Sequence, residues 1–550
     1  MLSRRSLLRA STAALATPAI LTGVAGRASA TASTLSIDLQ NNTGSNTVYA
    51  YVTGLAIDNG NAWYLLRADG QTPYYPSSPS STGTPLAVDC AIPLNASGAG
   101  PKRITIPRIA GGRLWFSVDR KLTFLLNPGP ALVEPSVTNS SDPNIDIQWD
   151  FCEFTFNSSV LYANVSAVDF AAMPIALKLT TGSGGTQSVP GLAAGGLDSI
   201  CAGLTAQHAA DGQGWDQLIV TSGGQNLRAL SPTAGIVRNS SLFSGYYSSY
   251  VDQVWAKYAS TPLTVDTQAS WGMLTGTVSG GLLTFPGAGS FAKPSAADIF
   301  SCNSGPFNVS SAVMGALTAR ISAALNRSTL LSDANQPDGE NPATYYTTSP
   351  TNHYARLVHA TSTDGRGYAF PYDDVTPNGG TDQSGFVTAG DPTLLTVTLG
   401  AVHGGGGTTP PSGGTSAFFT IQAASYTGQS GTTTETTSDT GGGYDVGYIA
   451  GGDWLGYANI DFGSGGATQF IARVASGAAS GVSGLVQVAL DSPTATPVGS
   501  FSLGNTGGWQ SWVTIPANIS RVTGVHTVYL TFASGQPADF VNIHWFTFAA

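Results

Sequence analysis

The sequence predicts a mainly β protein: a large N-terminal region with a smaller mixed α/β part, followed by a separate C-terminal β-sandwich. Glycine, serine and threonine lie between short runs of valine, tyrosine, phenylalanine and tryptophan, which is typical of many strands joined by tight turns. One stretch without core-forming side chains divides the chain, and the best helical spacing is confined to residues 310–325.

The composition narrows the classes of function. Only 10% of the 550 residues are charged, and the formal net charge is −10. The hydrophobic content argues against disorder, and the shortage of clustered Lys and Arg argues against nucleic-acid binding. Neutral glycans suit such a surface, because they are recognised through aromatic faces and amides more than through net charge.

The first 30 residues predict an export signal. Arg4 and Arg5 precede an apolar run that reaches about Val24, and residues 28–30 (ASA) form a small-x-small cleavage pattern. Paired arginines favour the twin-arginine route, so we expect the protein to be secreted without residues 1–30. No later stretch is long and apolar enough to span a bilayer, and we expect no membrane partner.

In residues 31–402, strand patterns dominate. Residues 103–106 and 114–118 alternate as strands do, whereas residues 310–325 repeat apolar side chains at helical spacing. Four cysteines lack the spacing of a zinc or redox site; an oxidising destination favours one or two disulfides, with buried free thiols as the alternative. These cysteines are Cys90, Cys152, Cys201 and Cys302.

Residues 403–416 predict a flexible linker. Their sequence is HGGGGTTPPSGGTS, in which Gly and Ser give flexibility and two prolines add a locally extended spacer. The linker leads to a module at residues 417–550, where short strands separated by turns predict an all-β sandwich.

A candidate catalytic pair lies in residues 146–170, which read DIQWDFCEFTFNSSVLYANVSAVDF. On a strand, Glu153, Thr155 and Asn157 share one face, and a second β-prone stretch from Val160 carries Asp169 near its end. Two carboxylates in one groove suit glycoside hydrolysis, because one protonates the departing oxygen while the other activates water or attacks the sugar. A strand with a solvated outer face is the alternative.

Several long segments resemble glycoside hydrolase family 64. They read GRLWFSVDRKLTFLLNPGPALVEPSVTNSSDPN, DFCEFTFNSSVLYANVSAVDF, FAKPSAADIFSCNSGPF and DGRGYAFPYDDVTPNGGTDQSG, and the likeness spans roughly residues 33–400. The resemblance implies an inverting β-1,3-glucanase that releases laminaripentaose. It also implies a thaumatin-like β-barrel or sandwich and a mixed α/β domain that flank a wide acidic groove.

The same resemblance assigns roles to individual residues. Glu153 corresponds to the general acid and Asp169 to the general base. Thr155, Asn157 and Tyr162 match positions that contact glucan, with Tyr162 standing where the family more often has Trp. Asp142 and Asp374 match further groove acids, with turn-forming roles as the alternative.

The C-terminal module resembles carbohydrate-binding module family 6 in GGGYDVGYIAGGDWLGYANIDF, NTGGWQSWVTI and DFVNIHWFTF. The resemblance implies that Tyr448 and Trp509 grip a sugar between their rings while Asn542 fixes its hydroxyls. The family's calcium positions correspond to Gln422, Ala424 and His544. Since carboxylates are missing there, we expect calcium binding to be weak or absent.

We therefore expect a secreted, monomeric, endo-acting β-1,3-glucan hydrolase with a glucan-binding module and no cofactor or metal in its mechanism. The alternatives are a non-catalytic thaumatin-like wall-binding protein and a hydrolase for another glucan linkage. His353 and His359 lack ligand partners in a metal pattern, so structural roles are expected for both.

Overall fold

The computed structural model describes residues 31–403, 415–417, 421–439, 444–462 and 466–549. It has two compact units, divided between Gly406 and Gly407, and each is described by itself. The predicted signal peptide and residues 404–414 of the predicted linker lie outside the described residues. Within the described ranges, no helix has both the length and the apolar character needed to cross a membrane.

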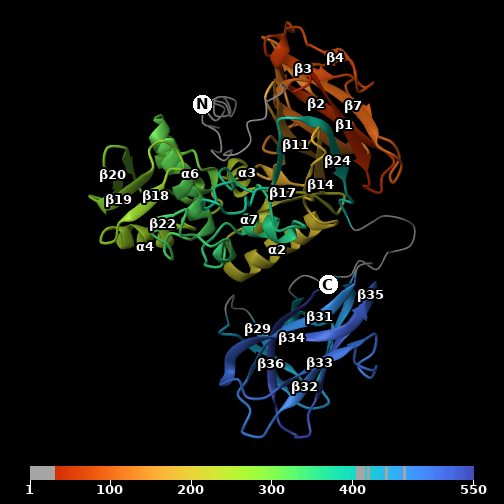
Figure 1. Ribbon diagram of the computed structural model, residues 1–550, viewed down its shortest axis with the longest axis vertical. Helices are drawn as coiled ribbons and strands as arrows, with labels where there is room; N and C mark the ends of the chain where they lie inside the picture. The colour runs from red at the N-terminus through yellow and green to blue at the C-terminus, as the bar shows by residue number, and fades with distance from the viewer. Residues whose placement is uncertain (1–30, 404–414, 418–420, 440–443, 463–465, 550) are drawn as a thin grey trace. The chain divides into compact units, whose positions relative to one another are not determined.

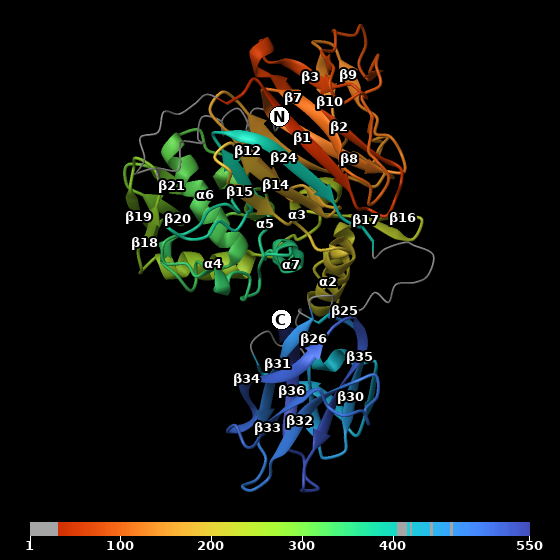
Figure 2. The same cartoon turned by 45° about the vertical axis from the view of Figure 1, so that its right-hand side comes forward.

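The first unit contains two sheets (Figure 1, Figure 2). Their hydrophobic side chains join one core. The first sheet has the order β15-β14-β24-β1-β7, with β1 parallel to β24. Its strands are β1 (Thr34–Asn41), β7 (Lys102–Pro107), β14 (Ile175–Thr181), β15 (Thr186–Val189) and β24 (Pro392–Leu399).

The second sheet has the order β23-β12-β11-β8-β2-β3-β4, with β6 paired to β2. Its strands are β2 (Val48–Ala56), β3 (Ala62–Leu66), β4 (Pro73–Tyr74), β6 (Ile92–Pro93), β8 (Ile109–Val118), β11 (Trp149–Phe156), β12 (Leu161–Val165) and β23 (Phe386–Ala389). A small sheet, β10-β9-β5, is formed by β5 (Thr84–Pro85), β9 (Leu125–Asn127) and β10 (Ala131–Val133).

The central strand β11 has the alternation expected from its sequence. Phe154 and Phe156 are buried in the core, whereas Glu153 and Thr155 are half-buried on the opposite face. The expectation for Asp169 was wrong in one respect: β12 ends at Val165, and Asp169 lies in a bend before β13 (Phe170–Ala171). The chain turns there to enter the mixed part of the unit.

The mixed part of the first unit combines six helices of the described chain with two small sheets. The helices are α2 (Gly196–Asp211), α3 (Pro232–Arg238), α4 (Ser248–Tyr258), α5 (Ala296–Ser301), α6 (Ala312–Arg327) and α7 (His353–Thr361). The sheets have the orders β13-β17-β16 and β21-β20-β19-β18-β22. Their strands are β16 (Ile219–Ser222), β17 (Gln225–Leu230), β18 (Leu263–Asp266), β19 (Met273–Ser279), β20 (Leu282–Phe285), β21 (Gly289–Phe291) and β22 (Asn335–Gln336).

Helix α6 confirms the predicted helix at residues 310–325 and shows how it begins. Ser311 is its N-cap, and the Ser311 hydroxyl accepts a hydrogen bond from the backbone N–H of Met314. Leu317 and Ile321 on its apolar face are fully buried. The four cysteines, in contrast, form no disulfide; all are buried free thiols, which was the alternative expectation.

The second unit is a curled β structure around its own hydrophobic core. Its sheet order is β25-β30-β35-β32-β33-β34-β31-β36-β29-β28, and the long β34 carries the sheet from one layer into the other. The strands are β25 (Thr415–Ser416), β26 (Ile421–Gln422), β27 (Gly428–Ser430), β28 (Thr433–Thr436), β29 (Tyr444–Ile449), β30 (Trp454–Asp461), β31 (Ala467–Ser476), β32 (Gly484–Leu490), β33 (Gly499–Leu503), β34 (Gly508–Val522), β35 (Val525–Ala533) and β36 (Val541–Ala549).

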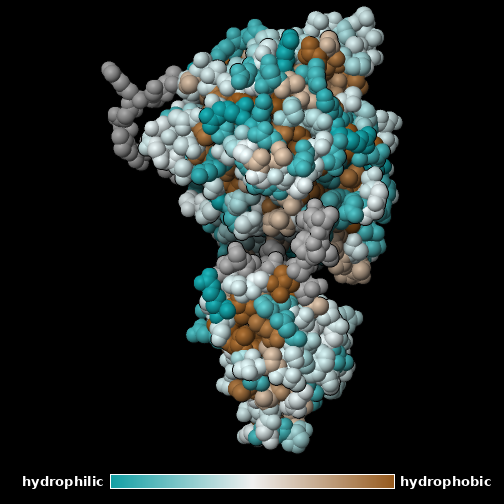
Figure 3. Space-filling view, turned by 90° about the vertical axis from the view of Figure 1, so that its right-hand side faces the viewer, coloured by the Kyte–Doolittle hydropathy of each residue, from teal (hydrophilic) through white to brown (hydrophobic). Residues whose placement is uncertain are grey.

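The surface matches the low charge content of the sequence. Figure 3 shows pale residues of intermediate hydropathy over much of the face in view, between smaller hydrophilic and hydrophobic areas. Such a surface follows from the many Gly, Ser and Thr residues.

Candidate functional site

An arginine and two glutamates form the centre of the candidate site. Glu153 on β11 stands directly opposite Arg113 on β8, and Arg113 in turn stands opposite Thr53 on β2. Arg113 donates Nε and Nη2 to Glu153 Oε1, each at 3.2 Å, and Nη1 to Glu134 Oε2 at 3.0 Å. The side chains of Glu134 and Glu153 keep 17% and 29% of their surface exposed, so both carboxylates lie at the edge of solvent.

Aromatic rings support the guanidinium from the same face of the sheet. The Arg113 guanidinium carbon lies 4.8 Å from the centre of the Phe151 ring and 5.4 Å from that of Trp115. Burial alone would lower the pKa of Arg113, but the charges of Glu153, Glu134 and Asp169 raise it. Arg113 therefore stays cationic at the meeting point of three carboxylates.

Asp169 reaches this charge cluster from the bend before β13. Its backbone carbonyl accepts a hydrogen bond of 3.0 Å from the N–H of Ser231. Ser231 is the N-cap of α3, so the start of a helix in the mixed part fixes the bend. The two predicted catalytic carboxylates thus come from different local structures, a sheet strand for Glu153 and a bend for Asp169, and both act electrostatically on Arg113.

Thr155 and Tyr162 lie beside Glu153 on the same sheet. Thr155 on β11 pairs with Tyr162 on β12, and Tyr162 pairs in turn with Thr388 on β23. The Tyr162 ring stacks on Phe386, with centroids 4.9 Å apart and an interplanar angle of 23°. This stacking covers one ring face and holds the side chain in place, which leaves the other face of Tyr162 as the possible contact for a ligand.

Asp374 approaches the same region from a loop far along the chain. Its side chain reaches solvent. The protein atoms packed around the carboxyl group raise its pKa, and the charge of Asp382 adds to this rise. Burial also raises the pKa of Tyr162, with further contributions from Asp374, Asp382 and Glu153. Because Asp374 and Glu153 both act on the pKa of Tyr162, the three predicted residues lie in one region.

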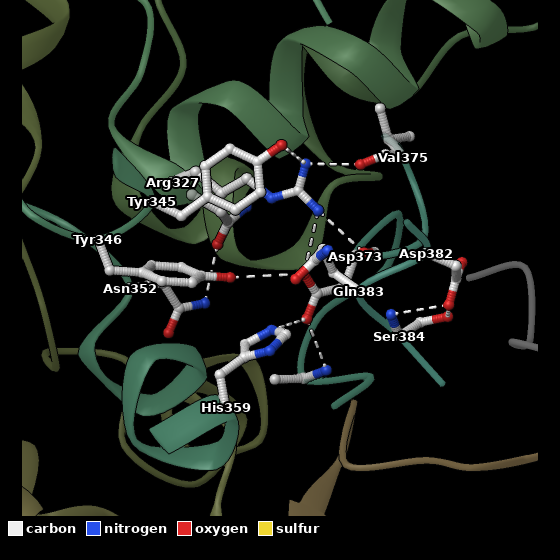
Figure 4. Close-up of polar contacts among 12 residues, drawn as sticks. Arg327, Tyr345, Tyr346, Asn352, His359, Asp373, Val375, Asp382, Gln383 and Ser384 are labelled. Atoms are coloured by element: carbon white, nitrogen blue, oxygen red, sulfur yellow. Dashed lines mark hydrogen bonds and ion pairs between the residues drawn. The ribbon is translucent and has the colours of Figure 1, made fainter. Parts of the chain in front are cut away.

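A buried ion-pair network shapes the loop that carries Asp374 (Figure 4). Arg327, at the last turn of α6, donates Nη2 to the Asp373 carbonyl at 2.9 Å and Nη1 to the Val375 carbonyl at 2.7 Å. The Asp373 carboxylate also contacts Arg327 Nη2 at 3.2 Å and His359 Nε2 at 3.0 Å. His359 has the structural role that was expected for it.

The second unit has a separate cluster of polar and aromatic residues at one end of its strands. Tyr448 is 58% exposed, and Trp509 is 37% exposed. The Asn542 side chain donates to Glu435 Oε1 at 2.6 Å and to the Trp509 carbonyl at 3.2 Å. Gly447 keeps this cluster open, because a Cβ at Gly447 would lie 3.0 Å from both Asn542 Oδ1 and Glu435 Oε1.

Comparison with known families identifies the families to which the two parts of the chain are similar. A model of glycoside hydrolase family 64, described as beta-1,3-glucanase, matches residues 33–399. The chain belongs to glycoside hydrolase family 64. It is therefore a glycoside hydrolase, and residues 422–550 match a model of carbohydrate-binding module family 6.

Individual relatives agree with this assignment. A glucan endo-1,3-beta-glucosidase from Cellulosimicrobium cellulans is 31% identical over 68% of this chain and 67% of its own length. The structure of a laminaripentaose-producing beta-1,3-glucanase in complex with laminaritetraose is 34% identical, with a TM-score of 0.60, over 68% of this chain and 99% of that one. The module is 38% identical over 126 residues, 22% of this chain and 19% of that protein, to an arabinoxylan arabinofuranohydrolase from Paenibacillus polymyxa.

Two predicted residues of the family 64 region have roles in turns. Asp142 is buried, and its carboxylate accepts hydrogen bonds from the backbone N–H groups of Ser136 and Asn144 and from the Asn144 side chain. Asn157 Oδ1 accepts from the N–H groups of Ser159 and Val160 in the turn after β11. For Asp142 this is the turn-forming alternative; glucan contact by either residue stays a prediction.

Four residues at the two candidate sites were not predicted from the sequence: Arg113, Glu134, Tyr368 and Glu435. Burial raises the pKa of Tyr368, and Asp374, Tyr162 and Glu153 add to this rise, so Tyr368 lies among the predicted residues. A partial signal was available for Arg113, because it stands directly before the predicted strand at residues 114–118 and two residues before Trp115. Glu134 and Tyr368 come from irregular segments, where periodicity gives no signal.

Two of the three positions named for calcium, Gln422 and His544, lie on opposite faces of their strands in the family 6 module. Gln422 pairs with Trp545 across β26 and β36, whereas His544 points to the opposite face and binds Asp439 Oδ2 at 2.9 Å. Among the described residues, no group of three or more His, Cys, Asp and Glu side chains is placed to hold a metal ion. Weak calcium binding stays a prediction.

Proposed function

We propose that this family 64 enzyme is secreted, cleaves β-1,3-glucan internally with inversion, and releases short laminari-oligosaccharides, laminaripentaose among them. The observation that carries the proposal is the placement of Glu153 and Asp169 around the Arg113 guanidinium at the solvent edge of the sheet. Two acids near one guanidinium provide the parts that glycoside hydrolysis needs.

In the proposed mechanism, Glu153 is the general acid and Asp169 the general base. Glu153 protonates the glycosidic oxygen as the bond to the departing sugar breaks. Asp169 takes a proton from the water that attacks the anomeric carbon from the opposite face, so the product configuration is inverted. The two carboxyl groups should then lie about 6.5–9.5 Å apart in a sugar complex, and a separation near 5 Å would indicate retention instead.

Tyr162, Thr155, Asn157, Asp142 and Asp374 are proposed to contact glucan along a wide acidic groove. The stacked ring of Tyr162 supports this role, because a pyranose presents a row of C–H groups to an aromatic face. The two sheets that share one core support a thaumatin-like architecture for this region.

The family 6 module is proposed to hold the enzyme on insoluble glucan. Tyr448 and Trp509 would contact the two faces of a sugar while Asn542 and Glu435 bind its hydroxyl groups. The exposure of both rings beside a buried, hydrogen-bonded amide supports this arrangement. Tethering raises the concentration of catalytic sites near the polysaccharide, which favours repeated cleavage by a monomeric enzyme.

Export by the twin-arginine route is proposed from residues 1–30. The paired arginines, the apolar run and the ASA ending support this destination. An extracellular polysaccharide is too large to enter the cell, so secretion fits the substrate.

The decisive experiment compares wild type with Glu153→Gln on laminarin, lichenan and cellulose. Wild type should release oligosaccharides from laminarin only, and Glu153→Gln should lose nearly all activity while its circular dichroism spectrum and melting temperature stay close to wild type. Wild-type turnover by the variant would remove Glu153 from the mechanism. Glucan binding without hydrolysis by wild type would favour the non-catalytic wall-binding protein.

A further inference from the structure

Glu134 is the second partner of the arginine that contacts the proposed general acid. Arg113 Nη1 lies 3.0 Å from Glu134 Oε2, slightly closer than the 3.2 Å between Arg113 Nη2 and Glu153 Oε1. The Arg113 guanidinium thus forms ion pairs with two carboxylates, Glu134 and Glu153.

A chain of hydrogen bonds fixes Glu134 in this place. The Thr53 hydroxyl donates to Glu134 Oε1 at 3.0 Å, and the Trp115 indole N–H donates to Thr53 Oγ1 at 2.9 Å. Thr53 is fully buried and Trp115 nearly so. Both oxygens of Glu134 are therefore engaged, one with Thr53 and the other with Arg113.

A general acid beside an arginine meets a physical conflict. An adjacent positive charge favours the ionised form of a carboxyl group, whereas a general acid has to carry a proton when substrate arrives. A second carboxylate on the same guanidinium reduces this conflict, because part of the positive charge is neutralised elsewhere.

We propose that Glu134 is a positioning residue that shares the charge of Arg113 and so allows Glu153 to carry the catalytic proton. This inference rests on the proposed role of Glu153. Both Arg113 contacts to Glu153 fall on Oε1, and no described residue forms a hydrogen bond with Oε2. Oε2 is thus the atom that holds the proton and faces the glycosidic oxygen.

The other titratable groups of this region are carboxyl groups and neutral phenols. They come from β12, from the bend before β13 and from the loops between α7 and β23. These groups are Tyr162, Asp169, Tyr368, Asp374 and Asp382. Arg113 is the cation that contacts Glu153, with Nη2 3.2 Å from Oε1.

The test is the pH profile of kcat/KM on laminarin, because its alkaline limb reports loss of the proton from the essential acid. Glu134→Gln keeps the size of the side chain and removes its charge, so the alkaline limb should move about 0.5–1 pH unit toward acid. Glu134→Asp keeps the charge and shortens the side chain, so its limb should stay at the wild-type pH even if the rate falls. An unmoved limb in Glu134→Gln, or equal shifts in both variants, would overturn the proposal.

A variant of Arg113 should shift the alkaline limb in the opposite direction, and this test does not depend on the folding of Glu134→Gln. Arg113→Gln removes the cation, so the alkaline limb should move to higher pH. A limb that stays in place or moves toward acid in Arg113→Gln would also overturn the proposal. Asp89→Asn, which breaks an exposed ion pair with Lys121, serves as the control and should leave the limb unchanged.

The outcome also separates this inference from the proposed catalytic roles. If Glu153→Gln is inactive and the Glu134→Gln limb does not move, Glu153 remains the acid and charge sharing is wrong. If Glu153→Gln keeps wild-type turnover, the proposed mechanism itself fails, whatever the pH profiles show.

Discussion

Arg327 Nη2 lies 3.2 Å from Asp373 Oδ1, and both side chains are fully shielded from solvent. The same guanidinium binds the backbone carbonyls of Asp373 and Val375, the two neighbours of Asp374. A buried ion pair therefore fixes the short loop from which the Asp374 carboxyl reaches solvent. Stability of the core and geometry of the site depend on the same contacts.

Breaking this buried pair should strongly destabilise the first unit. Asp373→Asn leaves Arg327 without its full counter-charge, and loss of one partner of a buried pair costs about 3–5 kcal/mol. The free energy of unfolding, measured in urea, checks this value. Lys293→Gln is the control: it breaks the Lys293–Asp252 pair, in which the two side chains are 47% and 65% exposed, and should change stability little. Equal effects of the two variants would contradict a special role for burial.

The His359–Asp373 contact predicts that stability falls as pH rises. Burial by itself would lower the pKa of His359, but the Asp373 charge and hydrogen bonds raise it above its ordinary value. The protonated histidine thus stabilises the fold fully below about pH 6.5, and this contribution is lost as pH rises through the folded pKa. The pKa of Asp373 is lowered, so its own contribution stays constant over this range.

Urea unfolding between pH 6 and pH 9 tests this dependence. Wild type should lose stability across the range, and His359→Gln should have a flatter profile. A variant profile parallel to that of wild type would exclude His359 as the source.

Tyr162 should contribute to substrate affinity through its ring. Tyr162→Ala removes a face that is worth about 0.5–1.5 kcal/mol in aromatic contacts, so KM for laminarin should rise roughly 3–10-fold with a smaller change in kcat. Tyr162→Phe and Tyr162→Trp should stay near wild type because both keep the ring. Tyr75→Ala, at an exposed ring of the same unit, is the control. A change in kcat alone would argue against a stacking role.

The family 6 module should bind insoluble β-1,3-glucan through its exposed rings. Tyr448→Ala and Trp509→Ala should each weaken binding roughly tenfold, measured by depletion from suspensions of the polysaccharide. Activity on soluble laminarin should not change, since the proposed catalytic residues lie in the other unit. Val513→Ser alters an exposed apolar residue on the same strand as Trp509 and should bind normally. Unchanged binding in both ring variants would place the sugar elsewhere.

Local patterns predicted the elements that depend on local physics. The period of two in β11 put Glu153 and Phe154 on opposite faces, and the period of 3.6 in α6 located its buried side. Patterns failed where the chain leaves regular structure, as at Asp169 in its bend. Such segments are set by contacts with distant residues, for example the bond from Ser231 to Asp169.

The sequence by itself determined the mainly β class and the families of the two parts, because alternation of side chains, composition and motif order are properties of the chain itself. Only the tertiary structure decided which charges meet. Arg113, Glu134 and Glu153 lie up to 40 residues apart, and Asp374 lies more than 200 residues further on. Electrostatic interactions depend on distance in space, and that distance is set by strand pairing and by the packing of loops against the sheet.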